Sequence, residues 1–160
     1  MFDVRCSMFD VPKMSELYFD DLKLGDNYES QPYRVTEAAI VDFAREFDVQ
    51  AFHLDPTAAK ETVFDGLAAS GWHTAAIAMR LFTTTLRFHG GAVGMGVDEL
   101  RWPVAVRPND NIHLETEILE LRPSRSKPGY GIVRIRNTAR NQDGAVVLSY
   151  TANALVRRRL

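Results

Sequence analysis

The segment between Trp72 and Phe82 constrains the fold most, because apolar residues lie on almost every side of the helix that it predicts. A helix with so little polar surface is buried on most sides. Three alanines, at positions 75, 76 and 78, would let a sheet wrap closely around this helix. By itself the pattern predicts a core helix and indicates no functional site.

Consecutive strands are expected after this helix, once the polar, glycine-rich loop 83–92 has crossed to them. The expected strands are 93–102, 111–121, 131–140 and 145–156. Turn sequences at 107–110 and 141–144 separate the first from the second and the third from the fourth. Alternation along 111–121 places Ile112 and Leu114 on one side and His113 on the other, as in a half-solvated antiparallel strand. We therefore interpret His113 as a surface residue.

The first half of the chain predicts one strand and two helices. A strand is expected at 28–35, followed by a helix that begins at the N-cap residue Thr36 and ends near Phe47. Asp55 before Pro56 marks the start of a second, short helix, since Asp caps a helix and Pro is tolerated in its first turn. Helices followed by consecutive strands are typical of an α+β domain.

Length and charge limit the class of protein. The chain has 160 residues, enough for one core of ordinary size, so we expect a flexible leader at 1–17 and a single domain at 18–160. A net charge of −2 gives no basic field for nucleic acid. No apolar run approaches the roughly 20 residues of a membrane helix, and the N-terminal residues lack the continuous apolar core of a signal peptide. With a single cysteine, Cys6, we expect a cytoplasmic protein with no membrane partner.

The stretch 47–56 holds the first candidate site. Ile40, Phe43, Ala44 and Phe47 form one apolar helical face that leads to Asp48, where a carboxylate meets the negative end of the helix dipole. Asp48 is therefore expected to be unfavourable for stability. His53 follows after only four residues, and a carboxylate and an imidazole that share one water form an acid/base arrangement. Alternatively, Asp48 is a solvated helix end and His53 an ordinary loop histidine.

Two motifs resemble those of a known family. The spacing Asp48-x4-His53 followed by Leu-Asp-Pro, together with Ala-Ser-Gly-Trp-His-Thr at 69–74, is similar to the MaoC-like dehydratase family, which includes the (R)-specific enoyl-CoA hydratases. The resemblance extends from about residue 18 to the C-terminus. One departure is that Gln50 and Ala51 replace the Asn-Pro pair that the family often has between its Asp and His.

The resemblance implies both a fold and an activity. The fold would be a hotdog, an antiparallel β-sheet wrapped around a long central α-helix, that forms a homodimer or a higher oligomer. The activity would be reversible hydration of trans-2-enoyl-CoA to (R)-3-hydroxyacyl-CoA, with Asp48 and His53 activating the water and the Gly71 N–H polarising the thioester oxygen. The substrate would carry coenzyme A, and no other cofactor and no metal would be needed.

Ser70 and Gly71 open the apolar helix, where free N–H groups favour negative charge. Glycine in a first turn costs up to about 1 kcal/mol relative to alanine, so it indicates a close approach of the backbone to another group. That group would be the thioester oxygen in the family. Alternatively, Ser70 is a simple N-cap and Gly71 relieves packing against Trp72.

Further residues are candidates for substrate binding. Phe52 and Trp72 flank the proposed reacting groups and would restrict the acyl chain if their rings turned toward it. Arg125 and Lys127 lie in a basic hairpin that could contact the phosphates of coenzyme A, although such hairpins are usually solvated. His73 is expected to be a hydrogen-bonded core residue. Two alternatives remain: a hotdog thioesterase and a non-catalytic acyl-CoA-binding module.

Overall fold

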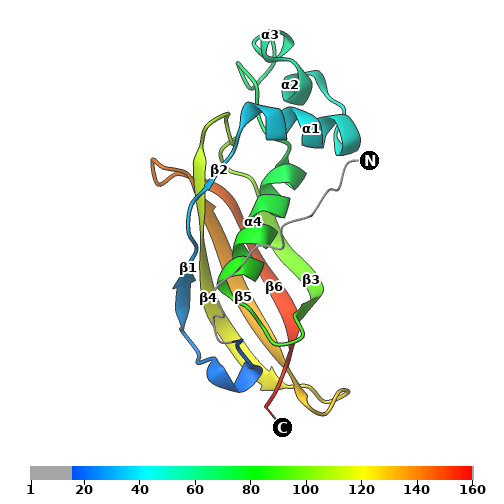
Figure 1. Cartoon of the computed structure of the whole chain (residues 1–160), viewed down its shortest axis with the longest axis vertical. Helices are drawn as coiled ribbons and strands as arrows, with labels where there is room; N and C mark the ends of the chain where they lie inside the picture. Colours follow the sequence, from blue (N-terminus) through cyan, green and yellow to red (C-terminus); the bar gives the residue numbers. More distant parts are fainter. Residues whose placement is uncertain (1–15, 160) are drawn as a thin grey trace, which may run out of the picture.

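The computed structural model describes residues 16–159, which form a curved antiparallel sheet around one long helix. The elements are η1 (Phe19–Asp21), β1 (Asn27–Glu29), β2 (Tyr33–Arg34), α1 (Glu37–Phe47), α2 (Ala51–Leu54), α3 (Pro56–Ala59), α4 (Gly71–Thr85), β3 (Ala92–Arg101), β4 (Asn111–Pro123), β5 (Tyr130–Arg140) and β6 (Val146–Arg157). The strand order is β1-β4-β5-β6-β3, with β2 also paired to β4 (Figure 1). This is the expected α+β class and hotdog fold.

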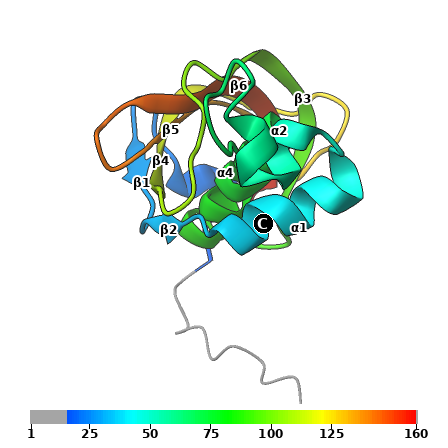
Figure 2. The same cartoon turned by 90° about the horizontal axis from the view of Figure 1, so that it is seen from above.

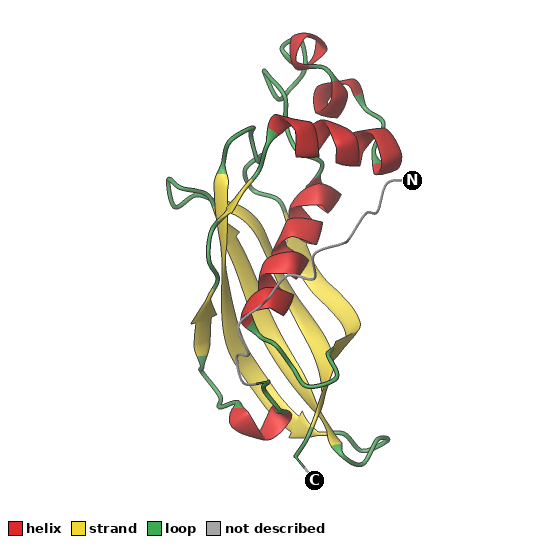
Figure 3. Cartoon of the chain, in the orientation of Figure 1, coloured by secondary structure: helices red, strands yellow, loops and turns green. Residues whose placement is uncertain are grey.

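Helix α4 lies along the concave face of the sheet (Figure 3). Its residues Ile77, Ala78 and Leu81 are buried, and they belong to the same apolar core as Ile118 of β4 and Val133 of β5. The expectation that this helix is buried on almost all sides is wrong for one face. Trp72 is 61 % exposed and Met79 53 % exposed, because this side of the helix carries no further layer of the same chain.

The helix is also longer than the sequence predicted. It continues to Thr85, so the expected crossing loop at 83–92 is reduced to the segment 86–91. The hydroxyl groups of Thr83 and Thr84 donate hydrogen bonds to carbonyl oxygens of the preceding helical turn. These bonds satisfy the two hydroxyl groups within the helix, whereas the sequence predicts both threonines in the loop.

The later strands lie within one or two residues of their expected positions, whereas the first strand does not. Instead of one strand at 28–35 there are two short ones, β1 and β2, separated by residues 30–32. Ser30 bridges the gap, since its backbone N–H donates to the Leu114 carbonyl and its hydroxyl accepts from the Leu114 N–H. Both short strands therefore stay attached to β4.

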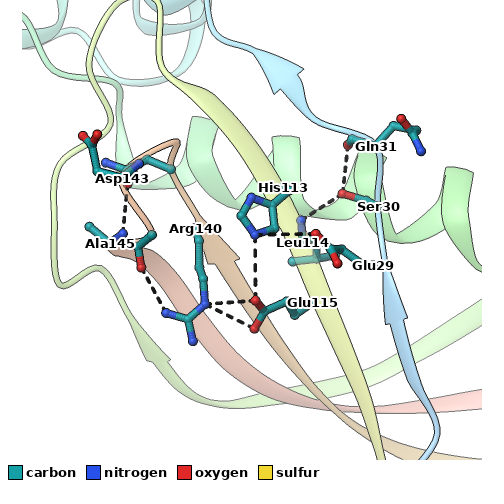
Figure 4. A network of polar contacts seen from close by, with 11 residues as sticks. Glu29, Ser30, Gln31, His113, Leu114, Glu115, Arg140, Asp143 and Ala145 are labelled. Carbon is teal, nitrogen blue, oxygen red and sulfur yellow. Dashed lines mark hydrogen bonds and ion pairs between the residues drawn. The ribbon is translucent and has the colours of Figure 1, made fainter.

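His113 lies on the face of the sheet that points away from α4, as expected for a surface residue. Its Nε2 is 3.9 Å from a carboxylate oxygen of Glu29 and 3.8 Å from one of Glu115. Arg140 on the neighbouring strand pairs with Glu115 at 3.1 Å (Figure 4). This network joins β1, β4 and β5 on the solvated face and is remote from the central helix.

The segment from Thr36 to Ala69, here called the helical cap, gathers over the N-terminal end of α4 (Figure 2). Both expected N-caps are confirmed: Thr36 accepts a hydrogen bond from the Ala39 N–H, and Asp55 accepts from the Thr57 and Ala58 N–H groups. The apolar face of α1 is shorter than expected, because Phe47 is exposed and contacts only the ring of Phe43 among the aromatic rings described.

The two ends of the described chain are tied to the rest of the fold. Leu17 pairs with Phe88, and Arg158 and Arg159 form ion pairs with Asp20 and Asp21. The leader expected at 1–17 lies outside the described residues apart from its last two. Between residues 16 and 159, no helix is long and apolar enough to cross a membrane.

Candidate active site

A cleft of about 560 Å³ separates the helical cap from the start of α4 and from the segment that follows β3. Its lining includes the acid and the histidine of the sequence motif, and the complete set is Asp48, His53, Val63, Phe64, Ala69, Gly71, Trp72, Thr74, Trp102, Pro103, Val104, Ala105, Val106 and Arg107. The same cleft is therefore lined by Asp48, His53 and Gly71, which lie within 23 positions of one another in the sequence.

His53 points its Nε2 atom at the Asp48 carboxylate, 3.4 Å from Oδ2. The imidazole ring is only 4 % exposed, and its Nδ1 lies 2.6 Å from the carbonyl oxygen of Ala68. A carbonyl oxygen can only accept, so this contact requires the proton on Nδ1 and leaves the Nε2 lone pair free in the neutral ring. Nε2 is therefore the atom of His53 that can accept a proton in the cleft.

Asp48 caps the C-terminal end of α1 and is held by side chains from two directions. The Ser70 hydroxyl is the main cause of a lowered pKa of the Asp48 carboxyl; the Gln50 amide and the charge of His53 lower it further, while burial opposes them. The Gln50 Nε2 donates to Asp48 Oδ1 at 2.6 Å. These contacts oppose the expected effect of the helix dipole, because they favour the ionised form of the carboxylate in the folded chain.

Gln50 also accounts for the departure from the family's Asn-Pro pair. Besides contacting Asp48, Gln50 accepts a hydrogen bond from the His53 backbone N–H through its own carbonyl oxygen, at 3.0 Å. Gln50 thus contacts both the Asp48 side chain and the backbone of His53 in the segment where the family often has Asn-Pro.

Ser70 and Gly71 begin α4 as expected, and Ser70 is the N-cap. The buried Ser70 hydroxyl accepts from the Trp72 N–H at 3.2 Å, while the Trp102 indole N–H donates to the Gly71 carbonyl at 2.8 Å. A Cβ atom on Gly71 would lie 2.9 Å from the Trp102 ring. Glycine at this position thus leaves room for the ring of a tryptophan 31 residues away, and the role of its N–H toward a thioester oxygen remains a prediction.

The two aromatic candidates differ in position. The Trp72 ring lines the cleft and packs edge-on against Trp102, with ring centroids 5.5 Å apart. The Phe52 ring instead packs edge-on against His53, at 4.5 Å, and beside Phe64, which lines the cleft in its place. Phe52 thus supports the imidazole from behind.

The basic hairpin does not join the cleft within one chain. Arg125 and Lys127 lie between β4 and β5, at the end of the sheet opposite α2 and α3 (Figure 1). The cation that lines the cleft is Arg107, which the sequence indicated only as part of a turn. Trp102 was also missed, because nothing in the sequence near it signals a contact with Gly71.

Two other histidines, His73 and His89, are not among the residues that line the cleft. His73 is buried as expected and stacks on Phe43 at 4.8 Å, and burial lowers its pKa. Its Nδ1 has no hydrogen-bond partner among residues 16–159. His89 is half-exposed, contacts Glu16 and stacks on Tyr18. Neither pairs with Asp48.

Known proteins of similar sequence and fold match this chain over most of their own length. A MaoC-like dehydratase from Rhodospirillum rubrum is 49 % identical, with a TM-score of 0.85, covering 90 % of this chain and 99 % of its own. The R-hydratase PhaJ1 from Pseudomonas aeruginosa is 25 % identical, with a TM-score of 0.76, covering 90 % and 88 %. The uncharacterized protein YdeM of Bacillus subtilis is 28 % identical over 141 residues, or 87 % of this chain and 98 % of YdeM.

The family model described as MaoC like domain matches residues 21–141, a range that contains the acid, the histidine and the helix start that line the cleft. The chain therefore belongs to the MaoC-like domain family.

Proposed function

We propose that this protein is a hydro-lyase that reversibly hydrates trans-2-enoyl-CoA thioesters to (R)-3-hydroxyacyl-CoA. The observation that carries the proposal is the buried His53 ring, whose Nδ1 is occupied by a carbonyl and whose Nε2 faces Asp48 across 3.4 Å at the wall of the cleft. Membership of the MaoC-like family and the likeness to an (R)-hydratase support chemistry of the hydratase type.

In the proposed reaction a water molecule is held between the Asp48 carboxylate and His53 Nε2. His53 takes one proton as the water oxygen bonds to the β-carbon, and the electron pair of the double bond moves toward the thioester oxygen. The Gly71 N–H at the start of α4 stabilises that developing negative charge. A proton then returns to the α-carbon from the same side, which completes a syn addition.

The lowered pKa of Asp48 supports its part in this scheme. A carboxylate that stays ionised accepts the second hydrogen of the water and stabilises the imidazolium that forms on His53. The Ser70 hydroxyl and the Gln50 amide, which donates to Asp48 Oδ1, both favour the ionised form of the acid. In this scheme His53 therefore acts first as the base and then as the acid, while the ionised Asp48 holds the water and stabilises the imidazolium.

Purified protein with crotonyl-CoA provides the test, with loss of enoyl absorbance and release of free thiol followed in parallel. Hydration lowers the absorbance without releasing thiol. Release of thiol would instead support the thioesterase alternative, and binding without either change would support a non-catalytic acyl-CoA-binding module.

The active form in this proposal is a homodimer. Strand β3 ends the sheet and pairs only with β6 in the described chain, and it exposes Val93, Met95 and Val97. An exposed apolar edge strand favours pairing with a second copy. Light scattering at micromolar concentration should give twice the chain mass of 18.0 kDa, and a monomer that retains activity would contradict this part of the proposal.

A further inference from the structure

The side chain of Arg107, half-buried at the wall of the cleft, is engaged with the backbone of the helical cap. Its Nη1 donates to the carbonyl oxygens of Gly66 and Leu67 at 2.9 and 3.2 Å, and its Nη2 donates to the carbonyl of Phe64. The turn that carries Arg107 is itself fixed, because the Arg107 backbone N–H donates to the Asp110 carboxylate at 2.8 Å. One guanidinium therefore donates hydrogen bonds to three carbonyl groups of the loop 64–67.

The loop that Arg107 holds would not be expected to keep its shape unaided. Asp65 and Gly66 have φ angles of +49° and +139°, so two successive residues leave the usual region of backbone conformation. A left-handed conformation at a non-glycine residue is unfavourable and needs support from its surroundings. Three carbonyls that point at one cation provide that support, since their dipoles would otherwise converge without a donor.

The same loop leads directly to the group that orients His53. Ala68 follows Leu67, its carbonyl accepts from the His53 Nδ1–H, and its N–H donates to the Phe52 carbonyl at 3.1 Å. On the other side, the Ala69 N–H donates to the Val106 carbonyl at 2.9 Å, next to Arg107. A continuous set of contacts therefore runs from the guanidinium through residues 66–68 to the imidazole ring.

We propose that Arg107 is a positioning residue for His53: by clamping the 64–67 loop it fixes the Ala68 carbonyl, which keeps the His53 proton on Nδ1 and the Nε2 lone pair toward Asp48. The inference rests on the proposed function in so far as His53 is the proton acceptor. Arg107 itself touches no reacting atom in this scheme. Both hydrogens of Nη1 and one of Nη2 are used by the loop, which distinguishes it from a cation reserved for phosphate.

Lysine cannot replace this arginine. The planar guanidinium presents several N–H groups in fixed directions, whereas an ammonium group is a compact charge that cannot span three carbonyls in the same way. Arg107→Lys keeps the positive charge at the cleft and removes the N–H groups with fixed directions. Arg107→Gln removes both.

The first readout is the tautomer of His53, followed by ¹⁵N NMR at a pH at which the ring is neutral, with its signals assigned by their loss in His53→Gln. The wild-type ring should show the proton on Nδ1, and both Arg107 variants should show a shift toward the Nε2–H form. Arg136→Gln is the control, because Arg136 pairs with Glu117 on the exposed face of the sheet. An unchanged His53 signal in a folded Arg107 variant would overturn the inference.

The second readout separates positioning from ligand binding. Misplacement of a catalytic group by about 1 Å can lower the rate by as much as a hundredfold, so kcat for crotonyl-CoA should fall about tenfold to a hundredfold in Arg107→Gln, with KM changed less than about twofold. Arg107→Lys should lie between this variant and the wild type. A rise in KM with unchanged kcat and an unchanged His53 signal would show that Arg107 binds substrate instead.

The two readouts also separate this inference from the proposed function. The NMR measurement needs no substrate, so it tests the clamp even if the wild-type protein does not hydrate crotonyl-CoA. If Arg107→Gln does not fold, Arg107→Lys still decides the question, because a folded lysine variant with a wild-type His53 signal contradicts the inference.

Discussion

The helical cap and the sheet differ in how their backbones are fixed. In the sheet, β4, β5 and β6 are joined by long antiparallel ladders of backbone hydrogen bonds, interrupted only by local register shifts. In the cap, short helices and loops are fixed by side chains that bond to backbone, such as Asp55 at the start of α3 and Arg107 over residues 64–67. We therefore expect the sheet to supply most of the stability and the cap to orient the side chains of the candidate site.

The largest effect on activity should come from substitutions of Asp48 and His53, which belong to the helical cap. Asp48→Asn and His53→Gln should each lower kcat by roughly a hundredfold or more, because each removes a positioned acid/base group. The double variant should be little worse than either single one, since groups that act as a unit are strongly non-additive. Steady-state kinetics on crotonyl-CoA measure both effects.

Chemical denaturation of the same variants provides the control. His53→Gln should unfold within about 1–2 kcal/mol of the wild type, which is the range for one lost buried hydrogen bond. Full hydratase activity in His53→Gln would show that a structural residue has been mistaken for a catalytic one.

A substitution in the core of the sheet should instead lower stability and leave kcat nearly unchanged. Ile118 of β4 is 1 % exposed and packs in the core, so Ile118→Ala should lower the free energy of unfolding by about 2–5 kcal/mol through lost burial and the cavity left behind. The kcat per folded molecule should stay close to that of the wild type. Loss of kcat without loss of stability would contradict the division between sheet and cap.

A smaller change is expected where the cap relies on one side chain for its shape. Asp55 accepts hydrogen bonds from two backbone N–H groups at the start of α3, and Asp55→Ala should cost about 1 kcal/mol of stability. Most of the activity should remain, because the Asp55 carboxylate is an N-cap and is not among the residues that line the cleft. Denaturant midpoints measured beside kcat would show whether cap geometry and catalysis can be separated.

The smallest effect concerns the charge on Asp48 and its dependence on pH. The folded-state pKa of Asp48 lies below the ordinary value of 3.8, because Ser70 and Gln50 favour the ionised form. Ionisation therefore stabilises the fold above pH 3.8, and this contribution is lost as the pH falls through the lower, folded-state pKa. The sequence suggested instead that removing this carboxylate would stabilise the protein slightly.

Denaturation of wild type and Asp48→Asn at several pH values checks this sign. Asp48→Asn should be slightly less stable than the wild type at neutral pH, and the difference should shrink below pH 3.8. A variant more stable than the wild type at neutral pH would favour the helix-dipole argument over the hydrogen bonds.

Much of the sheet could be predicted from the sequence because its signals are local. Alternation along β4 and turn residues at 107–110 and 141–144 predicted these strands closely, since side-chain direction reverses at every residue of a strand. The first strand failed because the break at residues 30–32 depends on Ser30 bonding to β4, 84 residues away. The prediction that α4 is buried on almost all sides failed for a related reason, because composition does not tell which side of a helix the rest of its own chain covers.

The site divides in the same way. The sequence by itself determined that Asp48 and His53 follow a helix end at a fixed spacing, and that Ser70 and Gly71 begin the central helix. Only the tertiary structure decided that the Ala68 carbonyl contacts the His53 ring, that the Trp102 ring lies against Gly71, and that Arg107 bonds to the loop between them. These contacts join residues 15, 31 and 41 positions apart, where local spacing gives no direction and packing of the cap against the sheet decides which groups meet.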